Sequence, residues 1–299
     1  MAVTLSVGSG KGGAGKSMIV ANLSVLLAKA GRRVCVVDLD LGGADTHVAF
    51  GIFEPEKSVT DFLTRKVAAI SETIQTLDSL YSLELIAGTG NTLRTANMTF
   101  QEKQRLLRAL KTIDTDVLIL DVGAGTNYHV LDFFMYADIQ LCVTCPDPAA
   151  IVDFYTFLQL ATIRKALSSF LSGGEVSKLL KEKPFETLTD VFDLAEQIQS
   201  GAREKAQQAL IHFNPLLTIN QVDDGAKINL LKLRKLAAKY LGIYLPDIGE
   251  IPVDPHIPKA LKNYLPVCEY APDSIASKAL QHMAVKLGRV IDLFISKKK

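Results

Sequence analysis

A group of glycines and lysines near the amino terminus is the part of this sequence best suited to chemistry. Residues 8–17 read Gly-Ser-Gly-Lys-Gly-Gly-Ala-Gly-Lys-Ser, and the spacing of Gly10, Gly15, Lys16 and Ser17 is that of a phosphate-binding loop. In such a loop, backbone N–H groups approach phosphate oxygens, the lysine bridges the β- and γ-phosphates, and the hydroxyl ligates Mg²⁺. The sequence therefore predicts a site for a magnesium nucleotide. Lys11 is additional to this pattern, and a second cation beside the loop suggests an active site that another subunit completes.

The segments on both sides of the loop support this interpretation. Residues 3–7 are apolar and β-branched, which predicts a buried strand, and residues 17–30, followed by Gly31, predict a helix with a glycine stop. A helix that begins at the loop adds the partial positive charge of its first turn. Because the full motif lies between a strand and a helix, a glycine-rich turn that binds nothing is the weaker alternative.

Carboxylates follow two further predicted strands. Asp38 and Asp40 lie at the carboxyl end of the strand predicted at 33–38, and Asp121 ends the strand predicted at 117–121. The carboxyl ends of parallel strands meet at one edge of a sheet, where carboxylates can serve Mg²⁺. Residues 123–125, Gly-Ala-Gly, could respond to a γ-phosphate.

Strands and helices alternate along the rest of the chain. This predicts one α/β domain over residues 1–299, with a mostly parallel central sheet flanked by helices on both faces. We expect further strands at 83–87, 139–144, 216–220 and 244–251, and helices near 100–113, 127–136, 150–171, 228–240 and 274–295. A helical insertion is predicted at about 173–212, where these apolar residues recur at helical spacing: Leu179, Leu180, Leu188, Val191, Leu194, Ile198 and Leu210. We favour the interpretation that this helical insertion packs on the edge of the sheet over the alternative that it is a subdomain for docking a partner.

Composition limits the possible partners and the compartment. The chain has 299 residues, 48% of them hydrophobic, and a formal net charge of +1. That is enough for a full α/β core, and it lacks the strongly basic balance typical of nucleic-acid binding. No signal peptide and no run long enough to span a membrane precede or follow the loop, so a cytoplasmic location is expected.

The four cysteines fit a reducing compartment. Cys142 and Cys145 could be read as a metal or redox pair, but their spacing puts the thiols on opposite faces of the strand predicted at 139–144. Buried structural cysteines are the favoured interpretation.

Several motifs resemble those of the MinD/ParA ATPases, which have a P-loop NTPase fold of the SIMIBI type. Residues 11–17 resemble their deviant Walker A motif, residues 38–42 their switch I segment, and residues 121–125 their switch II segment. Within that group the sequence is most similar to the flagellar-number regulators FlhG and FleN, through Thr-Cys-Pro-Asp-Pro at 144–148, Ile-Asn-Gln-Val at 219–222 and Ile-Pro-Val-Asp-Pro at 251–255. The resemblance covers residues 1–160 and resumes from about 214 to 280.

The resemblance implies roles for individual residues, with ATP or ADP and Mg²⁺ as cofactors. Lys11, Lys16 and Asp40 would be catalytic: Asp40 would position the attacking water, and Lys11 would reach the phosphates of the partner in a homodimer. The metal would be served by Ser17, Asp38, Asp40 and Asp121. Nucleotide would be bound by Gly10, Lys11, Gly12, Gly13, Ala14, Gly15, Lys16, Ser17, Met18, Asn220, Pro252, Val253 and Asp254. Many relatives have arginine after that asparagine, whereas this chain has Gln221, which makes adenine preference less secure than phosphate binding.

The predicted function is a weak, partner-stimulated ATPase that acts as a nucleotide-dependent dimerisation switch and regulates placement or number of a cellular assembly, such as the flagellum. An ATP-binding anti-activator that controls a transcription factor through the insertion is the main alternative. A metal or cluster carrier ranks lower because no cysteine pair suits a dimer interface. A DNA-segregating role ranks lower because basic residues are scattered, as at 164–165 and 232–235. The partner protein remains unidentified, and nucleic acid is not expected to be one.

The last predicted helix could pack on the sheet or contact a membrane. Its apolar stripe favours core packing and consists of Ile275, Ala279, Met283, Leu287, Ile291 and Phe294. Leu293 and Ile295 lie off that stripe beside three lysines, as in an interfacial anchor. Weak peripheral contact with the inner face of the cell membrane is therefore the alternative.

Overall fold

The computed structural model describes residues 2–40, 43–77, 80–81, 83–88, 98–170, 185, 187–223, 225 and 229–298. Its strands are β1 Val3–Ser9, β2 Val34–Leu39, β3 Gln75–Leu77, β4 Leu83–Ile86, β5 Val117–Ala124, β6 Ile139–Thr144, β7 Leu216–Val222 and β8 Asp247–Pro252. Its helices are α1 Lys16–Lys29, η1 Thr46–Phe50, α2 Val59–Leu63, η2 Ile70–Thr73, α4 Phe100–Leu110, α5 Tyr128–Tyr136, α6 Pro148–Leu167, α8 Leu188–Ile198, α9 Ala202–Leu210, α10 Leu230–Leu236, η4 Ala237–Leu241, α11 His256–Lys262, α12 Val267–Tyr270 and α13 Ile275–Lys298.

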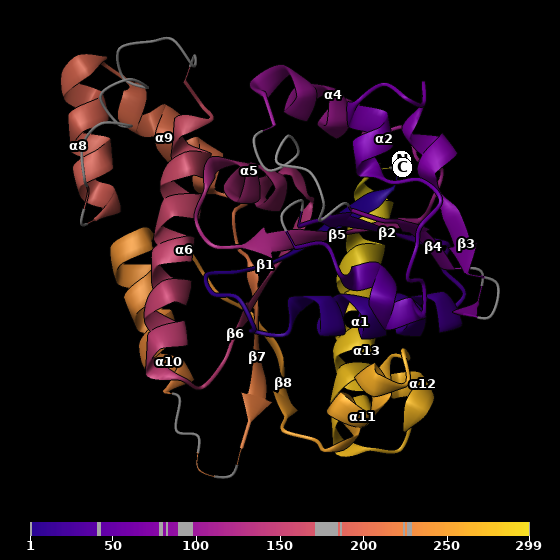
Figure 1. Cartoon of the computed structure of the whole chain (residues 1–299). Coiled ribbons are helices and arrows are strands. Elements are labelled where there is room, and N and C mark those ends of the chain that lie inside the picture. The colour runs from indigo at the N-terminus through magenta and orange to yellow at the C-terminus, as the bar shows by residue number, and fades with distance from the viewer. Residues whose placement is uncertain are drawn as a thin grey trace.

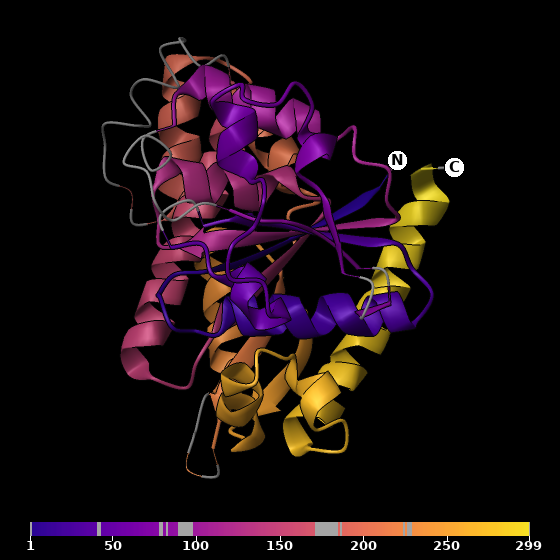
Figure 2. The same ribbon diagram turned by 45° about the vertical axis from the view of Figure 1, so that its right-hand side comes forward.

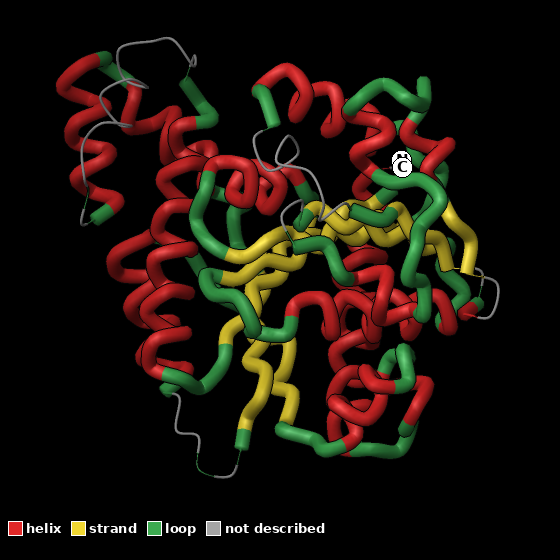
Figure 3. Tube along the Cα trace, in the orientation of Figure 1, coloured by secondary structure: helices red, strands yellow, loops and turns green. Residues whose placement is uncertain are grey.

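One eight-stranded sheet runs through the middle of the molecule, in the order β3-β4-β2-β5-β1-β6-β7-β8 (Figures 1 and 3). Every neighbouring pair is parallel except β3 and β4, which are antiparallel at one edge. The central strands are almost continuously apolar and buried, as expected for a parallel sheet covered on both faces. The predicted mostly parallel α/β fold is confirmed.

Two hydrophobic cores separate the sheet from its helices. Because side chains alternate along a strand, Cys35 and Val37 point into a core with α4, α5 and α6, whereas Val34 and Val36 point into a core with α1 and α13. Figure 2 shows α1 and α13 together on one side of the sheet.

The cysteines follow the same alternation. Cys142 belongs to the first core and Cys145 to the second, and all four cysteines are buried. The predicted burial of this pair on opposite faces of the sheet is confirmed. Burial also raises the pKa of the Cys142 thiol well above its usual range, which keeps it protonated.

Some predicted boundaries are wrong. The strand predicted at 117–121 continues to Ala124 and the one at 33–38 to Leu39, so Asp121 and Asp38 lie inside strands rather than at their ends. The strand predicted at 244–251 begins at Asp247, because the preceding Pro246 has no N–H group to donate to the ladder. The helix predicted at 100–113 ends at Leu110, and the edge strand β3 was not predicted.

The predicted insertion at 173–212 lies only partly within the described residues, which leave out 171–184 and 186 and therefore Leu179 and Leu180. Its described part forms α8 and α9 beside α6 at one end of the molecule (Figure 1). Leu188, Val191 and Leu210 are buried in the same core as α6. These two helices therefore pack on the body of the molecule.

The carboxyl-terminal helix α13 packs on the core through Met283, Leu287 and Ile291. Phe294 and Ile295 are partly buried against the same core, so the placement of Ile295 off the packing stripe is wrong. Ile275, predicted on the stripe, is 58% exposed. In the described part of the chain, no helix has the length and apolar character needed to cross a bilayer.

Candidate nucleotide-binding site

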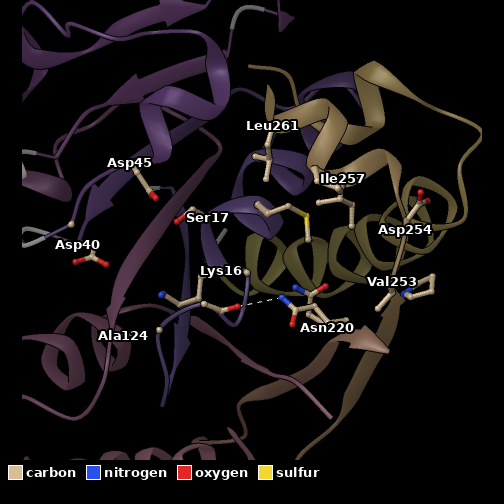
Figure 4. A pocket seen from close by; sticks show the side chains of 18 residues that line it. Lys16, Ser17, Asp40, Asp45, Ala124, Asn220, Val253, Asp254, Ile257 and Leu261 are labelled. Carbon is tan, nitrogen blue, oxygen red and sulfur yellow. Dashed lines mark hydrogen bonds between the residues drawn. The ribbon is translucent and has the colours of Figure 1, made fainter. Parts of the chain in front are cut away.

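A cavity of about 530 Å³ opens at the carboxyl ends of the strands (Figure 4). Five segments contribute to it, as is usual for ligand sites in open α/β sheets. Its lining consists of Gly12, Gly13, Gly15, Lys16, Ser17, Met18, Asp40, Gly43, Asp45, Ala124, Asn220, Gln221, Pro252, Val253, Asp254, Ile257, Pro258 and Leu261. The structure thus gathers most of the predicted nucleotide-binding residues around one space.

The loop before α1 needs glycine at two positions. Gly13 and Gly15 have φ angles of 79° and 89°, in the left-handed region that other residues rarely adopt. Gly15 immediately precedes α1, and a Cβ atom on it would lie 2.1 Å from Nδ2 of Asn220. A side chain at Gly15 would therefore be strained twice, by its backbone conformation and by a collision.

The end of β7 holds the loop in place. Nδ2 of Asn220 donates to the carbonyl of Ala14 over 2.9 Å, and Nε2 of Gln221 donates to the carbonyl of Gly13 over 3.3 Å. Asn220 is buried and its Oδ1 has no hydrogen-bond partner in the protein. That oxygen is left to accept a hydrogen bond from a ligand, such as an exocyclic amino group of a base.

Three predicted nucleotide-binding residues do not line the cavity: Gly10, Lys11 and Ala14. A Cβ atom on Gly10 would lie 2.1 Å from the carbonyl oxygen of Asp153, so this glycine lets the loop pass the backbone of α6. Ala14 is buried, with its carbonyl bonded to Asn220.

Lys11 lies at the surface. Its Nζ forms an ion pair of 2.9 Å with Asp147, and the two side chains are 44% and 49% exposed. Asp147 also caps the amino terminus of α6 by accepting the N–H of Ala149. The hydrogen bond from Lys11 to Asp147, together with their charges, raises the pKa of Lys11 above its usual value. Lys16, by contrast, is buried in the wall of the cavity.

Behind the cavity lie two buried carboxylates, Asp38 and Asp121, paired side by side on β2 and β5. Burial, followed by the charge of Asp121, raises the pKa of Asp38. Burial also raises the pKa of Asp121, against the opposing charge of Lys16 and the hydrogen bond from Thr46. Two buried like charges favour a proton or a cation between them.

Thr46 links these carboxylates. Its Oγ1 donates to Oδ2 of Asp121 over 2.7 Å, and its backbone N–H donates to Oδ2 of Asp38 over 3.1 Å. The other oxygen of Asp121, Oδ1, is buried without a hydrogen-bond partner. Thr46 was not predicted, since nothing in its local sequence indicates which strand it will contact.

The donor set fits Mg²⁺. Ser17 and Asp40 line the cavity, whereas Asp38 and the unpartnered oxygen of Asp121 lie behind it, where water could connect them to a metal. Within the described residues, no three His, Cys, Asp or Glu side chains cluster closely enough to hold a metal by themselves. Such a set suits an ion that takes one or two protein oxygens and completes its octahedron with water and substrate phosphates.

Asp40, in the predicted switch I segment, lies against Gly123 of the predicted switch II segment. Its backbone N–H donates to Oδ1 of Asp38 over 3.0 Å, and its half-buried carboxylate faces the cavity. A Cβ atom on Gly123 would lie 3.2 Å from Oδ1 of Asp40, so the carboxylate rests against the backbone near the end of β5. Leu41 and Gly42 of the predicted switch I segment are outside the described residues.

The other end of the cavity is apolar. Pro252 and Val253 of the β8 end face Ile257, Pro258 and Leu261 from α11, an arrangement that suits the flat faces of a base. Ile257 and Leu261 were missed, although their spacing of four on a helix is a readable signal.

The carboxylate of Asp254 has a structural task. It accepts the backbone N–H groups of His256 and Ala276, so it ties the end of β8 to the start of α13. Although burial acts to raise it, these hydrogen bonds lower the pKa of Asp254 to about 2.

Comparisons with known proteins agree with this geometry. Residues 1–166 match the model of the ParA family, described as an NUBPL iron-transfer P-loop NTPase. The chain is 26% identical to the antiactivator FleN of Pseudomonas aeruginosa, over 95% of this chain and 85% of FleN. It is 28% identical to the septum site-determining protein MinD of Helicobacter pylori, over 96% and 91%.

A solved structure has the same fold. MinD of Pyrococcus horikoshii, complexed with Mg-ADP, superimposes with a TM-score of 0.67 at 20% identity, over 97% of each chain. The family match covers more than half of the chain and includes the loop, Asp38, Asp40 and Asp121. The chain therefore belongs to the ParA family of P-loop NTPases, together with the MinD-like and FleN-like proteins.

Proposed function

We propose that this protein is an ATPase that works as a dimerisation switch: ATP joins two copies face to face, and hydrolysis separates them. The observation that carries the proposal is the position of Lys11. It is a loop lysine that does not line its own cavity, is half exposed, and is ion-paired with the exposed Asp147.

The electrostatics of this contact support a role in trans. An exposed ion pair contributes little, because water and salt screen it, so Lys11 can leave Asp147 at small cost. The γ-phosphate of a nucleotide in a facing copy offers more negative charge than one carboxylate. A cation supplied there stabilises the charge that develops during phosphoryl transfer, and it makes hydrolysis depend on dimerisation.

The remaining residues divide the chemistry among themselves. Lys16 would hold the β- and γ-phosphates, and the carboxylate of Asp40 would orient a water molecule toward the γ-phosphorus. Attack by that water breaks the bond between the γ-phosphorus and ADP and yields ADP and phosphate. Mg²⁺, when bound by Ser17 with Asp38 and Asp121 behind it, would neutralise phosphate charge.

We further propose that the switch regulates placement or number of a cellular assembly through a protein partner. The similarity to FleN and MinD over nearly the whole chain supports this output. An anti-activator role, as the name of FleN indicates for that protein, is the second candidate, with α8 and α9 as the contact region.

The family description mentions iron transfer, and an iron-sulfur cluster carrier of Aquifex aeolicus is 23% identical over 96% of this chain. We rank cluster transfer lower because all four thiols of this chain are buried, whereas cluster ligands shared between two subunits must reach an interface.

Light scattering coupled to size exclusion tests the switch. Wild type should be monomeric with ADP and dimeric with a non-hydrolysable ATP analogue, and Lys11→Ala should bind the analogue yet remain monomeric. Arg33→Ala is the matched control, because Arg33 is also an exposed, ion-paired cation but precedes β2, at the amino ends of the strands and away from the cavity. Dimerisation of Lys11→Ala to the wild-type extent would refute the role in trans.

A further inference from the structure

A second cavity, of about 680 Å³, lies away from the nucleotide-binding site, between the end of α2 and the exposed face of α4. Figure 1 shows these two helices close together on the same side of the sheet. Its lining is strongly basic and contains no acidic residue: Arg65, Phe100, Gln101, Gln104, Arg105 and Arg108. We call this set the arginine cavity.

The sequence of α4 places five of these residues on one rigid face. The opposite side of the helix is buried in the core through Leu106 and Leu110, and the five residues that follow the spacing of the exposed side are Phe100, Gln101, Gln104, Arg105 and Arg108. A capping box formed by Thr99 and Glu102 fixes the start of the helix.

The guanidinium groups are held in place to different degrees. Nη2 of Arg105 donates to the carbonyl of Phe62 over 2.9 Å, and its guanidinium lies 4.2 Å from the centre of the Phe62 ring. Arg108 donates through Nε to the Gln104 carbonyl of its own helix. Within the described residues, neither Arg65 nor Arg108 forms an ion pair. Both side chains are exposed, and Arg65 occupies a left-handed turn with a φ angle of 63°.

Acidic side chains on the neighbouring elements are already engaged. Asp61 pairs with Lys66, Glu102 accepts the N–H of Thr99, and Asp132 pairs with Lys103. The arginine cavity therefore keeps an excess of positive charge that no described residue of the chain neutralises. Phe100, 64% exposed, adds an apolar surface at its edge.

We propose that the arginine cavity binds an acidic segment of a protein partner, with carboxylates on Arg65 and Arg108 and an apolar side chain on Phe100. The planar guanidinium fork matches a carboxylate with two parallel hydrogen bonds. Gln101 and Gln104 supply donors and acceptors for the backbone of the bound segment.

The cavity favours a peptide over a nucleic acid or a lipid surface. Three cations in a hollow do not make the extended basic field that a phosphate backbone needs, and the chain as a whole carries a net charge of only +1. A flat membrane would meet a projecting basic surface more readily than a hollow one. Two of the three arginines are also free to rearrange around carboxylates, whereas Arg105 is already anchored.

Fluorescence anisotropy with a short labelled peptide, rich in glutamate with one central phenylalanine, tests the proposal without any nucleotide. Its outcome is therefore independent of the dimerisation switch. Wild type should bind, and Arg65→Gln combined with Arg108→Gln should weaken binding about 100-fold, or about tenfold per lost charge-assisted pair. Lys232→Gln combined with Lys235→Gln, two exposed lysines on α10, removes the same charge elsewhere and should change binding less than about twofold.

A second peptide, with alanine in place of the phenylalanine, tests the apolar part of the site. Wild type should prefer the phenylalanine peptide, and Phe100→Ala should abolish that preference. Equal weakening by the arginine and lysine variants would overturn the proposal, as would absence of peptide binding at low salt. Displacement of the peptide by duplex DNA or by phosphatidylglycerol vesicles at lower concentrations would assign the cavity to those ligands instead.

Discussion

Replacement of Gly15 by alanine tests the packing of the phosphate-binding loop against β7. The new Cβ would lie 2.1 Å from Nδ2 of Asn220, and the residue would have to keep a φ angle of 89°. The backbone conformation costs about 1–2 kcal/mol for an L-residue, offset by about 0.5 kcal/mol from the lower entropy of the unfolded chain. Displacement of Asn220 forfeits its hydrogen bond to Ala14, about 1 kcal/mol, and adds overpacking of about 1–3 kcal/mol.

The expected loss in unfolding free energy is therefore about 3–5 kcal/mol, measured by urea denaturation without nucleotide. Gly31→Ala is the matched control, because Gly31 has a φ angle of 83° but open space around its Cβ position. It should cost only about 1 kcal/mol. In a background with Asn220→Ala, the collision is absent, so the cost of Gly15→Ala should approach that of the control. If Gly15→Ala and Gly31→Ala cost the same within about 0.5 kcal/mol, the contact with Asn220 does not constrain the loop.

Substitutions at three further positions test other parts of the site. Asp254→Asn should cost about 1–2 kcal/mol at neutral pH, less than the full pKa shift because the amide oxygen of asparagine can still accept one of the two backbone N–H groups. Since the pKa of Asp254 in the folded state is depressed to about 2, its contribution to stability is present above the unfolded-state pKa of 3.8 and is lost as the pH falls through 2. A constant difference in unfolding free energy between wild type and Asp254→Asn, measured by urea denaturation at several pH values, would contradict this. Thr46→Val should lower the free energy of unfolding by about 2 kcal/mol, because it removes a hydrogen bond to Asp121. Thr46→Ser keeps the hydroxyl and should therefore retain most of that stabilisation. Equal losses in those two variants would show that the methyl group of Thr46 contributes as much as its hydroxyl, and would contradict a dominant hydrogen bond. Asp40→Ala should still bind ATP and accumulate as the dimer, with single-turnover hydrolysis slowed at least about 100-fold; rapid turnover would remove Asp40 from the chemistry.

The local parts of the site were predictable and the long-range contacts were not. Gly15, Lys16 and Ser17 form a motif between a strand and a helix, and that pattern is complete within about thirty residues, as such motifs usually are. The meeting of Asp38 and Asp121 requires knowledge that β2 pairs with β5 in a particular register. The sequence placed both near strand ends, which was enough to predict a shared site but not their burial.

Other features depended on contacts across the fold. Thr46 reaches Asp121 over 75 positions and Gln221 reaches Gly13 over 208, so no local pattern could indicate either contact. The failure at 244–251 has a different origin. Apolar and β-branched residues favoured a strand there, but Pro246 removed the donor that the ladder needs.

The elements before and after α8 and α9 in the chain, α6 and β7, each have one end beside the phosphate-binding loop. α6 begins at the residue after Asp147, the partner of Lys11, and β7 finishes with Asn220 and Gln221, whose side chains hold Ala14 and Gly13. The helices α8 and α9 are therefore connected in the chain to two elements, α6 and β7, that both contact the phosphate-binding loop. If another molecule docked on α8 and α9 and displaced them, the displacement would be transmitted to the phosphate-binding loop through both α6 and β7. Amide hydrogen exchange at residues 10–15 would register it.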